Sequence, residues 1–179
     1  MDIKAFKMDG LGNDFVIVDR RKSEINLTKE QIIKIGDRNN VGFDQIIFIE
    51  KKVKDVLPIK IYNPDGIEVG ACGNGSRCIA YLISKENNQK TIKLGAQNKI
   101  LEAEILSEKL VRINMGLPEF KDNKSIPIKE GLDPRKVSID FIQKEYGNGI
   151  CVNVGNPHII FFVKDCEKID IQKIGPKIE

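Results

Sequence analysis

The sequence of 179 residues contains no tryptophan and one histidine, and aromatic residues make up only 6% of it. Its 29 basic residues are scattered among 26 acidic ones, which leaves a net charge of +3. Nucleic-acid-binding surfaces need clustered cations, and many add aromatic side chains on which bases stack. We therefore expect no nucleic-acid partner. No apolar run approaches the roughly 20 residues of a membrane-spanning helix, so we expect no membrane contact either.

Cysteine is present but not in a pattern that binds metal. The four cysteines, at positions 72, 78, 151 and 166, contain no Cys-x-x-Cys pair, and the single histidine is distant in sequence. We therefore expect no metal site. The first residues lack the charged-then-apolar pattern of a signal peptide. Together these features predict a cytoplasmic protein with reduced thiols.

The most informative segment runs from Asn63 to Cys78 and contains four glycines. It joins an apolar run at 56–62, typical of a strand, to residues 76–86, whose apolar positions have helical spacing. We expect Gly73 and Gly75 to adopt positive φ and to let the backbone approach a ligand closely. A helix start also presents unpaired N–H groups and a positive dipole end, which together favour an anion.

Cys72 lies at the mouth of this expected anion site. The helix terminus should lower the pKa of its thiol from about 8.5 to about 7–8 and make it more reactive than the other three cysteines. Such a group can both take and give a proton. Beside a carboxylate held by the N–H groups of Gly73 and Asn74, it would suit chemistry at the α-carbon of an amino or hydroxy acid. A structural cysteine in a tight turn is an equally good interpretation.

The remaining pattern predicts an α+β protein in which antiparallel strands surround one buried helix. Thr28 and Gln31 form a capping box that should start a helix at 28–37, with Ile32, Ile33 and Ile35 facing inward. Gly and Pro near position 117 indicate a boundary between a first domain, 1–116, and a second, 117–179. Strands are expected at 3–8, 15–19, 45–50, 56–62, 91–94, 99–106, 110–115, 139–146, 150–154 and 159–163, and a short helix from Asp170 to Gly175-Pro176.

Several polar residues stand at the ends of these elements. Asn13 lies at a loop tip and Gln45 begins a strand, so both can face a cleft, although a turn residue and a solvated strand end are the simpler interpretations. Asn156 and His158 lie between two expected strands, where His158 is equally well explained as a half-buried structural residue. A hydrolase pair of Cys72 with His158 is disfavoured because no third orienting residue accompanies it.

Four segments, in this order along the chain, resemble the diaminopimelate epimerase family. They are Met8-Asp9-Gly10-Leu11-Gly12-Asn13-Asp14-Phe15, Gly42-Phe43-Asp44-Gln45, Asn63-Pro64-Asp65-Gly66 with Ala71-Cys72-Gly73-Asn74-Gly75-Ser76-Arg77-Cys78, and Val154-Gly155-Asn156-Pro157-His158. The resemblance implies two similar α+β domains, each a curved antiparallel sheet around a central helix. It implies a small amino-acid substrate, no cofactor, and an exchange between LL- and meso-diaminopimelate. A homodimer is an open possibility.

The same resemblance assigns roles to individual residues. Cys72 would be one of two cysteines that move the α-proton, and the N–H groups of Gly73 and Asn74 would hold the reacting carboxylate. Asn63 and Asn156 would bind the distal end of the substrate. Asn13 and Gln45 would line the cleft, and His158 would support the site.

The resemblance also has a gap. Neither Cys151 nor Cys166 lies in a glycine-rich loop that opens a helix, as the family's second catalytic cysteine does. We therefore expect an incomplete second domain and a chain that is inactive alone. Two alternatives remain. A proline racemase would carry histidine where this chain has Asn74, and a non-catalytic fragment would keep only half of the site.

Overall fold

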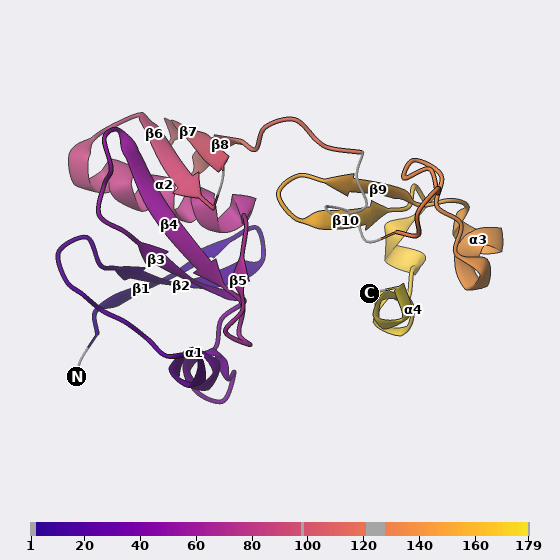
Figure 1. Ribbon diagram of the computed structural model, residues 1–179, viewed down its shortest axis with the longest axis horizontal. Helices are drawn as coiled ribbons and strands as arrows, with labels where there is room; N and C mark the ends of the chain where they lie inside the picture. The colour runs from indigo at the N-terminus through magenta and orange to yellow at the C-terminus, as the bar shows by residue number, and fades with distance from the viewer. Residues whose placement is uncertain (1–2, 98, 121–127, 179) are drawn as a thin grey trace. The chain divides into compact units, whose positions relative to one another are not determined.

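The computed structural model describes residues 3–97, 99–120 and 128–178. The chain divides into two compact units, Met1–Leu117 and Pro118–Glu179, and each is described by itself (Figure 1). No helix in the described ranges is long and apolar enough to cross a membrane.

The first unit is an eight-stranded sheet with two helices. The sheet order is β1-β2-β3-β4-β6-β7-β8, and β5 pairs with β4. The strands are β1 (Ala5–Gly10), β2 (Asn13–Asp19), β3 (Gln45–Ile49), β4 (Val56–Tyr62), β5 (Glu68–Val69), β6 (Thr91–Ala96), β7 (Lys99–Ser107) and β8 (Leu110–Asn114), and the helices are α1 (Lys29–Gly36) and α2 (Gly73–Asn87). The predicted α+β class and most predicted strands are confirmed, whereas the two-residue β5 was not anticipated.

The sheet is mixed rather than wholly antiparallel. β2 pairs with β3 in parallel, and β4 pairs with β6 in parallel. Parallel neighbours need a long crossover connection. The chain makes one crossover through α1 and the other through α2.

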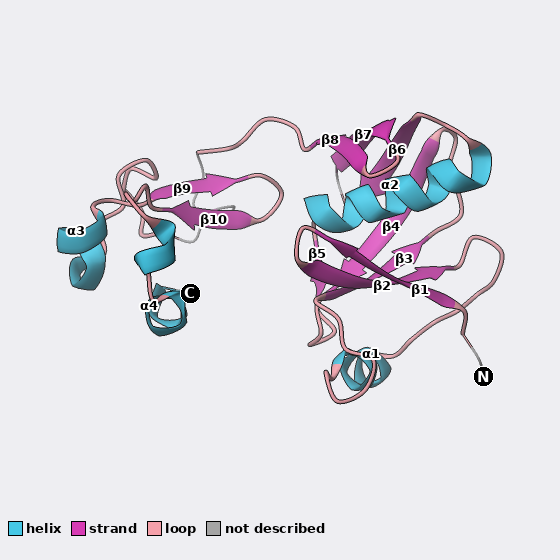
Figure 2. Ribbon diagram, turned by 180° about the vertical axis from the view of Figure 1, so that it is seen from behind, coloured by secondary structure: helices cyan, strands magenta, loops and turns pink. Residues whose placement is uncertain are grey.

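Helix α2 is the centre of the first unit. It contacts β1, β2, β6, β7 and β8, so the sheet curls around it (Figure 2). Its apolar face buries Cys78, Ile79, Ala80 and Ile83. These residues belong to the larger hydrophobic core of the unit, and their burial stabilises it.

Strand β2 is buried on both faces. In β2, Phe15 and Ile17 belong to the core around α2, whereas Val16 and Val18 pack in a second cluster with Ile32 of α1. Successive side chains of a strand point to opposite faces, which explains the division. A strand covered on both sides reads as a continuous apolar run rather than an alternating one.

Helix α1 confirms the capping box of Thr28 and Gln31. Ile32 is buried and Ile35 packs against the second cluster. Ile33 is 45% exposed, so the prediction that it faces inward is wrong. Residues three apart share one helix face, and the adjacent position is turned away from it.

The second unit contains a hairpin of β9 (Ile150–Asn153) and β10 (Pro157–Ile160), helices α3 (Asp140–Tyr146) and α4 (Ile171–Ile178), and a 3-10 turn at Cys166–Lys168. The strand predicted at 139–146 is wrong, because these residues form α3. Ile142 is its buried residue, and the N–H of Gln143 donates to the carbonyl of Ile139 at 2.8 Å. The alternation of Ile139 and Phe141 suggested a strand, but Ile139, Ile142 and Tyr146 are spaced for a helix face.

Two further boundaries in this unit differ from expectation. β10 includes His158 and ends at Ile160, and its residues are mostly exposed, so the predicted buried strand at 159–163 is wrong. Asp170 does cap the last helix, accepting a bond from the N–H of Lys173 at 3.2 Å. That helix continues through Pro176 rather than ending there. Pro176 has no N–H to donate to the carbonyl four residues earlier, so this turn of α4 has one backbone hydrogen bond fewer.

Replacing Ile79 with alanine should test the central role of α2. Ile79 is 0% exposed, so Ile79→Ala should lower the free energy of unfolding by about 2–5 kcal/mol. Ile33→Ala, on the exposed face of α1, is the matched control and should cost well under that. Urea denaturation of both variants measures the difference, and equal losses would contradict this packing.

Candidate active site

The strand directions bring the predicted polar residues of the first unit to one end of the sheet. β2 and β3 are parallel, so Asn13 and Gln45 both stand where their strands begin. β4 runs antiparallel to β3, so Asn63 follows at the same end, where Tyr62 pairs with Ile46. The side-chain amide of Gln45 donates to Asn63 Oδ1 at 3.2 Å.

Cys72 is the residue directly before α2. The helix starts at Gly73, three residues before the predicted start at Ser76. The sulfur of Cys72 accepts a hydrogen bond from the N–H of Gly75 at 3.3 Å, and its carbonyl accepts from the N–H of Ser76 at 2.9 Å. Cys72 therefore occupies the N-cap position that Ser, Thr, Asp or Asn usually fill.

The expectation of a lowered pKa for Cys72 is wrong. Burial raises the pKa of this thiol above its ordinary value, while the N–H groups of Gly75 and Asn74 and the charge of Arg77 act in the opposite direction. A buried thiolate loses its hydration, and here that loss outweighs the hydrogen bonds of the helix start. In the first unit as described, Cys72 is a protonated thiol at neutral pH.

The two glycines after Cys72 do not have the positive φ that we expected. Both lie in the first turn of α2. A Cβ atom added to Gly75 would overlap Cδ1 of Ile47 and lie 3.3 Å from a ring carbon of Phe15. Gly75 is therefore needed for close packing of the helix on the sheet. At Gly73 the same atom would meet only the side chain of Met115 among the described residues, with Sδ at 3.4 Å and Cε at 3.8 Å.

A row of polar side chains runs across this end of the sheet. The Asn74 amide donates to Asn13 Oδ1 at 2.7 Å, and the Asn13 amide donates to Asp44 Oδ2 at 3.0 Å. Arg77 donates to Asn74 Oδ1. Asp44 and Arg77 were not among the predicted site residues. Asp44 lies in one of the segments that carry the family resemblance, and its position beside Gln45 was the available signal.

The aspartate end of this row is braced by cations. Arg38 bridges Asp14 at 2.7 Å and Asp44 at 2.6 Å, and Lys7 bridges Asp14 at 2.7 Å. The hydrogen bond from Arg38, with Lys7 beside it, holds the pKa of Asp14 well below its usual range. Asp14 and Asp44 each accept a bond from the other's backbone N–H, at 3.0 Å. These bonds tie the start of β2 to the residue before β3.

Two polar atoms near this end are buried without a hydrogen-bond partner in the described part of the chain. They are Gln45 Oε1 and the hydroxyl of Ser76. Buried polar atoms are usually paired. An unpaired amide oxygen beside Asn63 can accept a bond from an N–H group of a ligand.

Asn156 and His158 belong to the second unit, and both are exposed there. His158 lies within β10 rather than between strands, opposite Val152 of β9. Its Nδ1 is 3.0 Å from the carbonyl of Asn156, which can only accept, so Nδ1 is the donor in this contact. This contact holds the two residues in one local arrangement.

The other three cysteines lie in different surroundings. Cys78 belongs to the core, as predicted, and burial raises its pKa to about 11. Cys151 is buried in β9, where burial also raises its pKa, and Cys166 is exposed in the 3-10 turn. Neither Cys151 nor Cys166 caps an α-helix.

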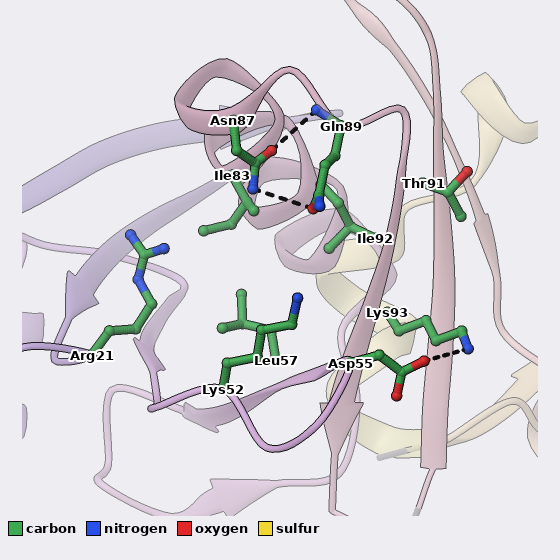
Figure 3. Close-up of a pocket in the computed structure, with 10 residues that line it drawn as sticks. All are labelled: Arg21, Lys52, Asp55, Leu57, Ile83, Asn87, Gln89, Thr91, Ile92 and Lys93. Carbon is green, nitrogen blue, oxygen red and sulfur yellow. Dashed lines mark hydrogen bonds and ion pairs between the residues drawn. The ribbon is translucent and has the colours of Figure 1, made fainter.

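The pocket drawn in Figure 3 lies at the other end of α2, beside Ile83 and Asn87. It has a volume of about 250 Å³. Two of its cations are already neutralised, because Arg21 pairs with Asp19 and Glu86 and Lys93 pairs with Asp55. It contains none of the predicted site residues.

Solved structures with similar architecture include two proteins of low sequence identity. A predicted epimerase from Pseudomonas aeruginosa has a TM-score of 0.62 at 14% identity, and the alignment covers 98% of this chain and 67% of that one. A PhzF-family phenazine biosynthesis protein from Bacillus anthracis has a TM-score of 0.61 at 20% identity, covering 93% and 58%. The chain thus shares its fold, a curled sheet around a helix, with these two proteins.

Sequence comparison gives the family within that class. The family described as diaminopimelate epimerase matches residues 5–121. Diaminopimelate epimerases of Pelagibacter ubique and Acidiphilium cryptum are 49% and 38% identical, over 100% and 97% of this chain. The chain belongs to the diaminopimelate epimerase family. It spans 66% and 62% of the lengths of these two relatives.

Replacing Gly75 with alanine should disturb the site through packing. The added methyl group must displace Ile47, so Gly75→Ala should cost about 1–3 kcal/mol of stability. Gly73→Ala is the control and should change stability by no more than about 0.5 kcal/mol, because its methyl group meets only the flexible Met115. Thermal denaturation distinguishes the two, and a neutral Gly75→Ala would contradict the close contact.

Thiol alkylation should follow exposure and pKa. Because the pKa of Cys72 is raised, we expect iodoacetamide to modify Cys166 before Cys72 at pH 7, and Cys78 and Cys151 last. The rate at Cys72 should increase steeply as the pH rises through and above the ordinary thiol range, because only the thiolate reacts. Mass spectrometry of tryptic peptides measures all four rates. Modification of Cys72 first at pH 7 would show that its pKa is lowered instead.

Proposed function

We propose that this chain carries the Cys72 half of a cofactor-independent epimerase site that interconverts LL- and meso-diaminopimelate. The observation that carries the proposal is the position of the Cys72 sulfur at the N-terminus of α2. There a thiol lies beside backbone N–H groups that attract a carboxylate. Membership of the diaminopimelate epimerase family supplies the substrate class.

The first turn of α2 supplies the carboxylate-binding groups in this proposal. The N–H groups of Gly73 and Asn74 belong to the four that a helix start leaves without helical partners. A substrate carboxylate held there places its α-carbon close to the Cys72 sulfur. The same N–H groups stabilise the negative charge that develops when the α-proton leaves.

Cys72 would act as a proton donor in its resting state. Its raised pKa keeps it protonated, so it delivers a proton to one face of the α-carbon while a second thiol takes the proton from the other face. In the reverse direction Cys72 is the base, because each step must run through the same groups.

The polar residues around Cys72 would recognise the rest of the amino acid. The unpaired oxygen of Gln45 can accept from an ammonium group, and Asn63 and Asn13 offer amides that both donate and accept. We further propose Asn156 as a ligand for the distal end and His158 as its support. The four free cysteines favour the cytoplasm as the location. We also propose a homodimer, which gel filtration tests.

Exchange of the α-hydrogen tests the proposal directly. The chain is incubated with diaminopimelate in D₂O, and proton NMR follows loss of the α-hydrogen signal. We expect exchange that disappears in Cys72→Ala and persists in Cys166→Ser. Ligand titration monitored by NMR of the protein accompanies it, and exchange that persists unchanged in Cys72→Ala would contradict a proton-transfer role for Cys72.

A further inference from the structure

The polar row consists of Asp44, Asn13, Asn74 and Arg77. The charged residues at its two ends determine which way each hydrogen bond in it runs. An ionised aspartate can only accept hydrogen bonds, and an arginine can only donate them. Asp44 must therefore meet the N–H₂ of Asn13, and Arg77 must meet the oxygen of Asn74. The bond between them then has one consistent arrangement, from the Asn74 amide to Asn13 Oδ1.

This direction matters because an asparagine amide is nearly symmetric in shape. Without fixed partners, Asn13 and Asn74 could each turn by 180° and exchange donor for acceptor. With both ends fixed, one N–H of each amide and one lone pair of each oxygen remain available in known positions. The row thus determines what these two side chains can offer to a ligand.

We propose that Asp44 and Arg77 are positioning residues, which orient the amides of Asn13 and Asn74 at the active-site end of α2. This inference rests on the proposed function for its ligand, but the arrangement itself belongs to the unliganded chain. Asp44 is suited to the role because it is anchored independently. Its Oδ2 also accepts from the N–H of Asp14 at 3.0 Å, and its Oδ1 accepts from Arg38 at 2.6 Å.

The ends of the row also act on Cys72, and in opposite senses. The positive charge of Arg77 lowers the pKa of the Cys72 thiol, and the negative charge of Asp44 raises it. The neighbouring thiol of Cys78 is a further titratable group that interacts with Cys72. Neutralising Asp44 should therefore move the alkylation of Cys72 to lower pH, and neutralising Arg77 should move it to higher pH.

Side-chain NMR gives the first test, with Asp44→Asn and Arg77→Gln as the variants. Each substitution introduces an amide, which can both donate and accept hydrogen bonds. The original residue at each position can only accept (Asp44) or only donate (Arg77). We expect hydrogen exchange at the side-chain amides of Asn13 and Asn74 to become several-fold faster in both variants. Arg112→Gln is the matched control, because Arg112 pairs with Glu104 between β8 and β7 and not with any residue of the row, and it should leave both amides nearly unchanged.

The pH profile of Cys72 alkylation gives the second test. We expect its midpoint to move by a few tenths of a pH unit, downward in Asp44→Asn and upward in Arg77→Gln. A merely structural role would give shifts of the same sign or none. Unchanged amide exchange, or shifts of the same sign, would overturn the proposal. If Asp44→Asn does not fold, Arg77→Gln with the Arg112→Gln control decides it. Neither readout requires turnover, so failure of the proposed function would leave this result intact.

Discussion

The first unit depends on the burial of α2 within a curled sheet. The helix contacts strands from both halves of the sheet, and its first turn approaches β2 and β3 so closely that Gly75 has no room for a side chain. This contact fixes the height of the helix start above the sheet. Cys72 caps that start, so the position of its sulfur is set by core packing rather than by a flexible loop. A rigid support of this kind is what a proton-transfer group requires.

The sheet topology brings amide side chains to the end of the sheet where α2 begins. Because β2 and β3 are parallel and β4 returns beside β3, three separate segments deliver amide side chains to the end where α2 begins. Hydrogen bonds then join Asn13 to Asn74 and Gln45 to Asn63. Asn13 and Asn74 are 61 positions apart in sequence and become neighbours because α2 packs against β2.

Much of this was predictable from the sequence, and the errors have physical causes. Strands buried on one or both faces, such as 56–62, and the capping box of Thr28 are local patterns, and both were predicted correctly. The direction of the pKa shift of Cys72 was not predicted correctly. The sequence shows that Cys72 precedes a helix, but it does not show that distant strands bury the thiol. Gly75 was assigned a conformational role for the same reason. Its close neighbour Ile47 lies on β3, far from it in sequence. In 139–146, helical and strand spacing compete within eight residues, and the sequence alone favoured the wrong one.

The contact between Gly75 and Ile47 has an evolutionary consequence. The atom that a methyl group at position 75 would overlap is Cδ1 of Ile47, and valine lacks that atom. The two positions are therefore not free to vary independently: a larger residue at 75 becomes tolerable only after the side chain at 47 has become shorter. Position 47 lies two residues after Gln45 on the same strand. Any such pair of changes would repack the core beneath the first turn of α2, so the mutational paths open to the residue that follows Asn74 depend on an isoleucine of the sheet.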